Sequence, residues 1–200
     1  MYKTIFLSGP HGSGKTSFIN TLIEKYPKFK KNNFEIDFLK EYPSMPNMNM
    51  FERCLLRLYH RFYTAELTEK ISKDTDSIIL VDRGIHDSLA YSNVEYGLGE
   101  MDAAHHNLLI QIGNTCVDML KPYTIILNPP VDVIMDRLHK RKLEGTRPER
   151  EILCAREDTQ EYVERIHNEF EKFKNEKNVL YLTDNDLTAE ALVTEWLKSL

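Results

Sequence analysis

The glycine-rich segment at residues 9–16, GPHGSGKT, constrains this chain more than any other part of its sequence. An apolar run at 4–7 leads into the segment, and a helical pattern with Phe18, Leu22 and Ile23 on one side follows it. Glycines let a backbone bend tightly and turn successive N–H groups inward, and a following helix adds its own unpaired N–H groups and positive dipole end. Such an arrangement binds phosphate groups. The sequence therefore predicts a nucleoside triphosphate site in this loop.

The loop matches the pattern G-x-x-x-x-G-K-[ST] at every fixed position. Lys15 is expected to reach the β- and γ-phosphates, and the Thr16 hydroxyl is expected to bind Mg²⁺. ATP and Mg²⁺ are therefore the predicted cofactors. The residues expected to bind the nucleotide all lie in or next to the loop: Gly9, His11, Gly12, Ser13, Gly14, Lys15, Thr16 and Ser17.

Short apolar runs alternate with helical patterns along the rest of the chain. Strands are expected at 4–7, 34–38, 77–82, 123–127 and 178–184. Helical spacing of apolar residues is found from Phe51 onward, at 103–120, at 131–142, from Ile152 to Phe173, and at the end of the chain. Continuous apolar strands alternating with helices are typical of a parallel sheet covered on both faces. We therefore expect an α/β sandwich of three layers, with residues 1–200 forming one domain.

Composition excludes several classes of protein. The net charge of −5 does not favour a surface for polymeric nucleic acid or for a membrane, and no apolar run approaches membrane-spanning length. Cys54, Cys116 and Cys154 lie far apart, which indicates reduced thiols and no zinc site. Because the sequence begins directly on a strand pattern, no signal peptide is expected. These features predict a cytoplasmic protein.

A second set of polar residues follows the strand pattern at 77–82. Asp82 is expected at its carboxyl end, where ligands bind in open α/β sheets, and its carboxylate can hold Mg²⁺. Arg83 beside it can hold an anionic or polar acceptor through two hydrogen bonds. Thr16 and Asp82 are therefore the predicted metal ligands.

The segment DRGIHDSLAY, residues 82–91, resembles the Asp-Arg-(Tyr/His)-x-x-Ser-x-x-Ala-Tyr signature of thymidylate kinases. It is also similar to the Glu-Arg-Ser element of deoxynucleoside kinases. The resemblance implies a five-stranded parallel sheet with helices on both sides, a lid over the active site, and phosphoryl transfer from ATP to a small-molecule acceptor. Gly84 departs from the signature, because thymidylate kinases usually carry a ring at this position.

The predicted lid spans about residues 138–155. Its basic residues are similar to the arginines that deoxynucleoside kinases and some thymidylate kinases place over the triphosphate. The arginines of this region are Arg137, Arg141, Arg147, Arg150 and Arg156. They would neutralise charge that builds up on the transferred group, and Arg147 is the one assigned to catalysis. The alternative is a solvated pair of helices held by salt bridges.

The acceptor site follows partly from the resemblance and partly from helix periodicity. Glu41 lies near the position of the general base of deoxynucleoside kinases, and a base is needed only for a neutral hydroxyl acceptor. Arg53, Arg57 and Arg61 form a ridge four residues apart, which favours a phosphorylated acceptor. The predicted catalytic residues are Lys15, Asp82, Arg83, Glu41 and Arg147, and the predicted acceptor-binding residues are Glu41, Arg57, Arg61 and Arg83.

These features predict an ATP-dependent kinase for a nucleoside monophosphate, like thymidylate kinase. Three alternatives remain open: a deoxynucleoside kinase that phosphorylates a 5′-hydroxyl, a kinase for a small alcohol, and an ATP-binding regulator without turnover. The expected partner is a small phosphate acceptor and neither polymeric nucleic acid nor a membrane. Whether the protein forms a homodimer is left open by the sequence.

Overall fold

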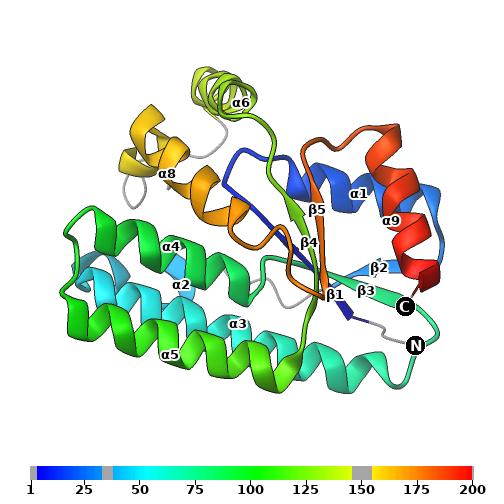
Figure 1. Ribbon diagram of the computed structural model, residues 1–200, viewed down its shortest axis with the longest axis horizontal. Helices are drawn as coiled ribbons and strands as arrows, with labels where there is room; N and C mark the ends of the chain where they lie inside the picture. Colours follow the sequence, from blue (N-terminus) through cyan, green and yellow to red (C-terminus); the bar gives the residue numbers. More distant parts are fainter. Residues whose placement is uncertain (1–3, 33–37, 146–154, 200) are drawn as a thin grey trace.

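The computed structural model describes residues 4–32, 38–145 and 155–199 (Figure 1). Its centre is a sheet of five parallel strands in the order β2-β3-β1-β4-β5. The strands are β1 (Thr4–Ser8), β2 (Phe29–Lys31), β3 (Ile78–Asp82), β4 (Tyr123–Leu127) and β5 (Val179–Leu182). The predicted five-stranded parallel sheet of an α/β sandwich is confirmed.

Helices cover both faces of this sheet (Figure 1). One face packs against α1 (Lys15–Lys25) and α9 (Leu187–Ser199). The other packs against α3 (Met50–Ser72), α4 (Ile85–Gly97) and α8 (Gln160–Glu171), and α5 (Ala103–Leu120) packs mainly against α3 and α4. The remaining described elements are α2 (Phe38–Glu41), α6 (Val131–Leu143) and two 3₁₀ turns, η1 (Met45–Asn47) and η2 (Ala155–Asp158).

The central strand β1 shows why the apolar runs form strands. Ile5 and Leu7 are fully buried against α1 and its neighbours, whereas Phe6 points to the opposite face and packs with Ala65 and Val81. Successive residues of a strand face opposite sides, so a strand buried on both faces must be apolar throughout. The packing of β1 on both faces places the glycine loop at the carboxyl edge of the sheet.

Two predicted elements lie elsewhere in the structure. The second strand of the sheet is β2 at Phe29–Lys31, which precedes the expected strand at 34–38. Phe38 begins α2, so the expected strand is wrong at that residue, and residues 33–37 lie outside the described residues. In the edge strand β2 only Phe29 is buried, so it lacks the apolar run expected of a strand. Of the helix expected from Ile152 to Phe173, residues 155–158 form η2 and 152–154 lie outside the described residues. Helix α8 begins at Gln160, because the Thr159 hydroxyl accepts a hydrogen bond from the Tyr162 N–H and caps it there.

Two further expectations concern membrane-spanning helices and the state of the cysteines. None of the helices in the described ranges is long and apolar enough to cross a membrane. Cys54 and Cys116 are buried free thiols, in agreement with the expected reduced state, and Cys154 lies outside the described residues.

Candidate functional site

The glycine loop between β1 and α1 has a backbone that requires glycine. Gly9, Gly12 and Gly14 have φ values of 143°, 81° and 99°, in the region that other residues rarely adopt. A Cβ atom at Gly9 would lie 2.1 Å from the carbonyl oxygen of Leu127 on β4. The loop is therefore held against the neighbouring strand, and its path leads directly into the amino-terminal end of α1, where an anion is favoured.

Lys15 lies buried over this loop. Its ammonium group donates hydrogen bonds to the carbonyl oxygens of Gly9 (2.8 Å) and Pro10 (2.7 Å) and to the Ser13 hydroxyl (3.2 Å). Burial and, to a lesser extent, the charge of Arg83 lower the pKa of Lys15 to about 7. The structure thus places the Lys15 ammonium group among the polar atoms of the glycine loop, away from competing water.

Thr16 and Asp82, the predicted metal ligands, lie together at the carboxyl edge of the sheet. The Thr16 hydroxyl donates a hydrogen bond of 2.7 Å to Asp82 Oδ2. One residue begins α1 and the other ends β3. A hydroxyl and a carboxylate at this distance are oxygen donors of the kind that Mg²⁺ prefers, so this pair fits the predicted ion.

Arg83 follows β3 in a strained conformation with a φ of 76°. Its guanidinium donates to Asp87 Oδ1 at 2.8 Å, and Asp87 Oδ2 accepts from the Gly84 N–H at 3.0 Å. Asp87 is fully buried, and sequence reasoning did not assign it a role. Burial alone would raise the pKa of Asp87, but Arg83, Arg61 and Lys15 outweigh burial and lower it. The (i, i+4) spacing of Arg83 and Asp87 was the available signal.

The predicted arginine ridge on α3 divides into two parts. Arg61 donates to the Ser88 hydroxyl at 2.6 Å, and burial lowers the pKa of Arg61 to about 10. Arg57 lies 3.9 Å from a carboxylate oxygen of Glu157 on η2. Arg53 instead donates to two backbone carbonyl groups near η1. Arg57 and Arg61 therefore reach the other site residues, whereas Arg53 stabilises the entry to α3.

The structure gives a reason for glycine at position 84. A Cβ atom at Gly84 would lie 3.0 Å from Cβ of Phe6, whose side chain packs against α3 on this face of the sheet. The φ of Gly84 is −130°, which any residue can adopt, so the restriction is steric. In this chain the Phe6 side chain fills the space next to residue 84.

The arginines of the predicted lid have different partners. Arg137 on α6 donates a hydrogen bond to the Ser13 carbonyl at 2.6 Å and so connects the glycine loop to α6. Arg156 on η2 pairs with Glu95 and Glu100 of the α4 region. Arg147 and Arg150 lie outside the described residues, as do residues 146–154 of the predicted lid, which begins within α6.

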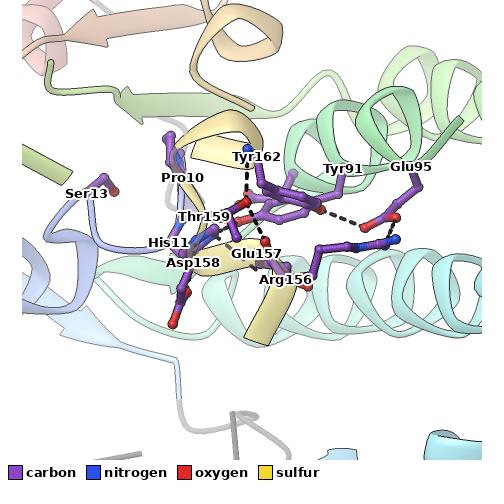
Figure 2. A network of polar contacts seen from close by, with 12 residues as sticks. Pro10, His11, Ser13, Tyr91, Glu95, Arg156, Glu157, Asp158, Thr159 and Tyr162 are labelled. Carbon is purple, nitrogen blue, oxygen red and sulfur yellow. Dashed lines mark hydrogen bonds and ion pairs between the residues drawn. The ribbon is translucent and has the colours of Figure 1, made fainter. Parts of the chain in front are cut away.

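The contacts of His11 and the exposure of Glu41 do not test the roles that the sequence predicts for them. The His11 N–H donates to the Tyr91 hydroxyl at 3.1 Å, and its ring lies toward Tyr91 and η2 (Figure 2). Glu41 is exposed at the end of α2, about ten residues after β2. Neither residue contacts Lys15 through a hydrogen bond or ion pair found among the described residues. Their assignment to ATP and to the acceptor, respectively, stays a prediction.

Comparison with known proteins supports the fold described above. No family model matches the chain. A thymidylate kinase of Latilactobacillus sakei subsp. sakei (strain 23K) is 26% identical over 155 residues, which are 70% of this chain and 69% of the relative. A structure of deoxyadenosine kinase from M. mycoides with the products dCMP and a flexible dCDP bound has a TM-score of 0.69 at 19% identity, over 98% of this chain and 100% of that one.

A second structure of the M. mycoides enzyme, with bound dATP, has a TM-score of 0.66 at 18% identity, over 98% of both chains. Both types of relative are kinases, one named for a nucleotide and the other for a nucleoside, so they do not favour either predicted acceptor. These findings agree with the predicted group and with the predicted kinase activity. The chain is similar in sequence to a thymidylate kinase and in fold to a deoxyadenosine kinase.

Proposed function

We propose that this protein transfers the γ-phosphoryl group of ATP to a nucleoside monophosphate. The observation that carries this proposal is the charge at the carboxyl end of β3. Arg83 and Arg61 both interact with the buried carboxylate of Asp87, and the Lys15 ammonium group lies close enough to interact with it as well. Asp82, the predicted metal ligand, also interacts with Lys15 and Arg83. Three basic groups therefore face two carboxylates, which leaves positive charge for an acceptor phosphate and for the group in transfer.

The residues have distinct roles in this reaction. The backbone N–H groups of the glycine loop bind the phosphates of ATP, and Lys15 stabilises charge that develops on the transferred group. Thr16 and Asp82 are the residues that would hold Mg²⁺, which when bound neutralises phosphate charge. Arg83, fixed by Asp87, orients the acceptor.

A nucleoside acceptor is the second candidate, and the contact of Arg57 favours it. Because Glu157 faces Arg57, that arginine has less charge to offer an acceptor phosphate. A neutral hydroxyl would need a base, and Glu41 is the proposed one. A regulator without turnover is the third candidate. We propose further that the protein acts in the cytoplasm; formation of a homodimer stays a prediction.

The test is a coupled ADP-release assay with Mg-ATP and matched pairs of nucleosides and nucleoside monophosphates, with Lys15→Met as the blank. We expect turnover with a monophosphate and none with the corresponding nucleoside. The opposite result would establish the second candidate and make Glu41→Gln the next variant. ATP binding without stimulation by any acceptor would refute nucleotide and nucleoside transfer together.

The lowered pKa of Lys15 predicts proton uptake when ATP binds. A bound triphosphate favours the charged lysine, so its pKa must rise above the value of about 7 found here. At pH 8 Lys15 is mostly neutral before binding, and uptake should approach roughly one proton for each ATP. At pH 6 it should be near zero. Calorimetry in buffers of different ionisation enthalpy measures this uptake, and the difference between wild type and Lys15→Met isolates the lysine. An identical uptake in both proteins would contradict the prediction.

A further inference from the structure

A buried carboxylate on α4 has no part in the phosphate chemistry described above. Glu95 is 2% exposed and accepts a hydrogen bond of 2.7 Å from the Tyr162 hydroxyl of α8. Its second oxygen pairs with Arg156 of η2, whose guanidinium also pairs with Glu100. A buried carboxylate is costly unless such partners compensate it. These contacts join α4, α8 and η2 at one point (Figure 2).

The two residues after Arg156 face the glycine loop and α3, here called the acceptor helix because it carries the predicted acceptor-binding residues Arg57 and Arg61. Asp158 Oδ1 lies 3.3 Å from His11 Nε2 in the loop. Glu157 is 8% exposed, and its carboxylate lies 4.0 Å from His11 Nδ1 and 3.9 Å from the Arg57 guanidinium. The short η2 turn therefore carries Arg156 toward α4 and two carboxylates toward the site (Figure 2).

Helix α4 contacts this arrangement through two residues that lie one turn apart, Tyr91 and Glu95. Tyr91, one turn before Glu95, lies with its hydroxyl 3.0 Å from His11 Nδ1. The rings of Tyr91 and Tyr162 are 6.3 Å apart, and the His11 ring lies 6.1 Å from that of Tyr162. One face of α4 thus fixes the loop through Tyr91 and η2 through Glu95.

We propose that Glu95 is a positioning residue of the reaction: through Arg156 it holds η2 so that Glu157 and Asp158 lie against the acceptor helix and the glycine loop. Arg156 is then an anchor rather than a cation that acts on the triphosphate. In the absence of the Glu95 charge, the Arg156 guanidinium would be free to pair with the adjacent carboxylates. The acceptor side of the site would lose the contact of Glu157 with Arg57. The phosphate-binding loop would lose the contacts of η2 with His11. It would keep those of Tyr91, Lys15 and Arg137, which hold its backbone. This inference rests on the proposed function only for its effect on catalysis.

The test compares Glu95→Gln with Glu169→Gln in the full chain. Glu169 accepts a 2.9 Å hydrogen bond from Asn93, so it also links α8 to α4, and it pairs with Lys172 of its own segment. Among the described residues, these partners do not include any residue of η2. Amide hydrogen exchange measures the anchor whether or not the protein has activity. We expect exchange in the peptide 155–162 to be about 10-fold faster in Glu95→Gln and unchanged in Glu169→Gln, because only the first variant loses an ion pair with η2.

Kinetics measure the catalytic consequence. With the best acceptor, Glu95→Gln should raise the acceptor KM by about 10-fold and leave the ATP KM within twofold, a split that general destabilisation would not give. Arg156→Gln should have the same effect, and the double variant should be no worse, because the two residues act as one unit. Unchanged exchange at η2, or a larger effect of Arg156→Gln on ATP, would overturn the proposal. If no acceptor supports turnover, the proposed function fails, and the exchange result still decides the anchor.

Discussion

Replacement of Lys15 by methionine is expected to lower kcat by roughly 100- to 1,000-fold, the usual effect of removing one pre-positioned group that stabilises charge in the transition state. Methionine keeps most of the length of the side chain and can lie among the same atoms, so the fold should survive. The buried carbonyl oxygens of Gly9 and Pro10 each lose a donor, so some loss of stability is expected beside the loss of activity. The measurement is steady-state kinetics with the acceptor identified by the panel assay.

Lys25→Met is the matched control, because it removes the same charge from the same helix. Lys25 lies at the far end of α1 and pairs with Glu190 at 2.8 Å, with its side chain 44% exposed. Loss of this lysine leaves the buried Glu190 carboxylate without its partner and costs stability, but it removes no charge from the glycine loop. The folded variant should therefore keep activity within about twofold of wild type. If the two variants had similar kcat values, the role assigned to Lys15 would be wrong.

Replacement of Asp87 by asparagine is expected to destabilise the fold and to displace Arg83. Loss of one member of a buried ion pair leaves the partner uncompensated and costs about 3 kcal/mol, the lower end of the usual range, because the Arg83 side chain is 30% exposed. In a chain of this size the corresponding fall in melting temperature is about 6–12 °C. Arg83 should then no longer orient the acceptor, so the acceptor KM should rise as well.

Calorimetry or thermal unfolding monitored by circular dichroism provides the measurement, and Asp118→Asn, an exposed position on α5, provides the control. The pKa of Asp87 is lowered in the folded protein, so its stabilisation is present above the unfolded pKa of about 3.9 and is lost as the pH falls below it. The difference between wild type and Asp87→Asn should be constant from pH 5 to 8 and shrink below about pH 4. A difference that disappears near pH 7 would contradict this assignment.

The parts of the fold that could be predicted are those with strong local signals. The expected helix at 103–120 and the expected strand at 123–127 agree with α5 and β4 residue by residue, because each has an uninterrupted apolar pattern. The glycine loop was predictable for a different reason, since its backbone conformation and its charge both require particular residues at fixed spacing. The pairing of Thr16 with Asp82 followed from both lying at the carboxyl edge of one sheet.

The remaining features depend on contacts between distant segments. Arg156 pairs with Glu95 and Glu100, but nothing in the local sequence distinguishes it from the basic residues before it. Its role at the triphosphate was predicted only because it lies close to those residues in the sequence. Strand β2 was misplaced because an edge strand needs only one apolar residue to pack. The spacing of Asp87 from Arg83 was a signal for their pair, but the interaction of Asp87 with Arg61 could not be predicted, because Arg61 lies on another helix at a separation that no spacing rule covers.

The close approach of Gly84 to Phe6 has a consequence for how related chains can vary. A Cβ at 84 would lie 3.0 Å from the Cβ of residue 6, and it would also lie 3.3 Å from Cγ and 3.4 Å from Cδ1 of the Phe6 ring. The ring contacts depend on the size of residue 6, so the sizes of the two side chains cannot be chosen independently. Chains that carry a ring after the Asp-Arg pair should have a small side chain in the middle of the first strand. Chains with a bulky residue in that strand should have glycine after the pair. The two sites, far apart in the sequence, should therefore change together as sequences diverge.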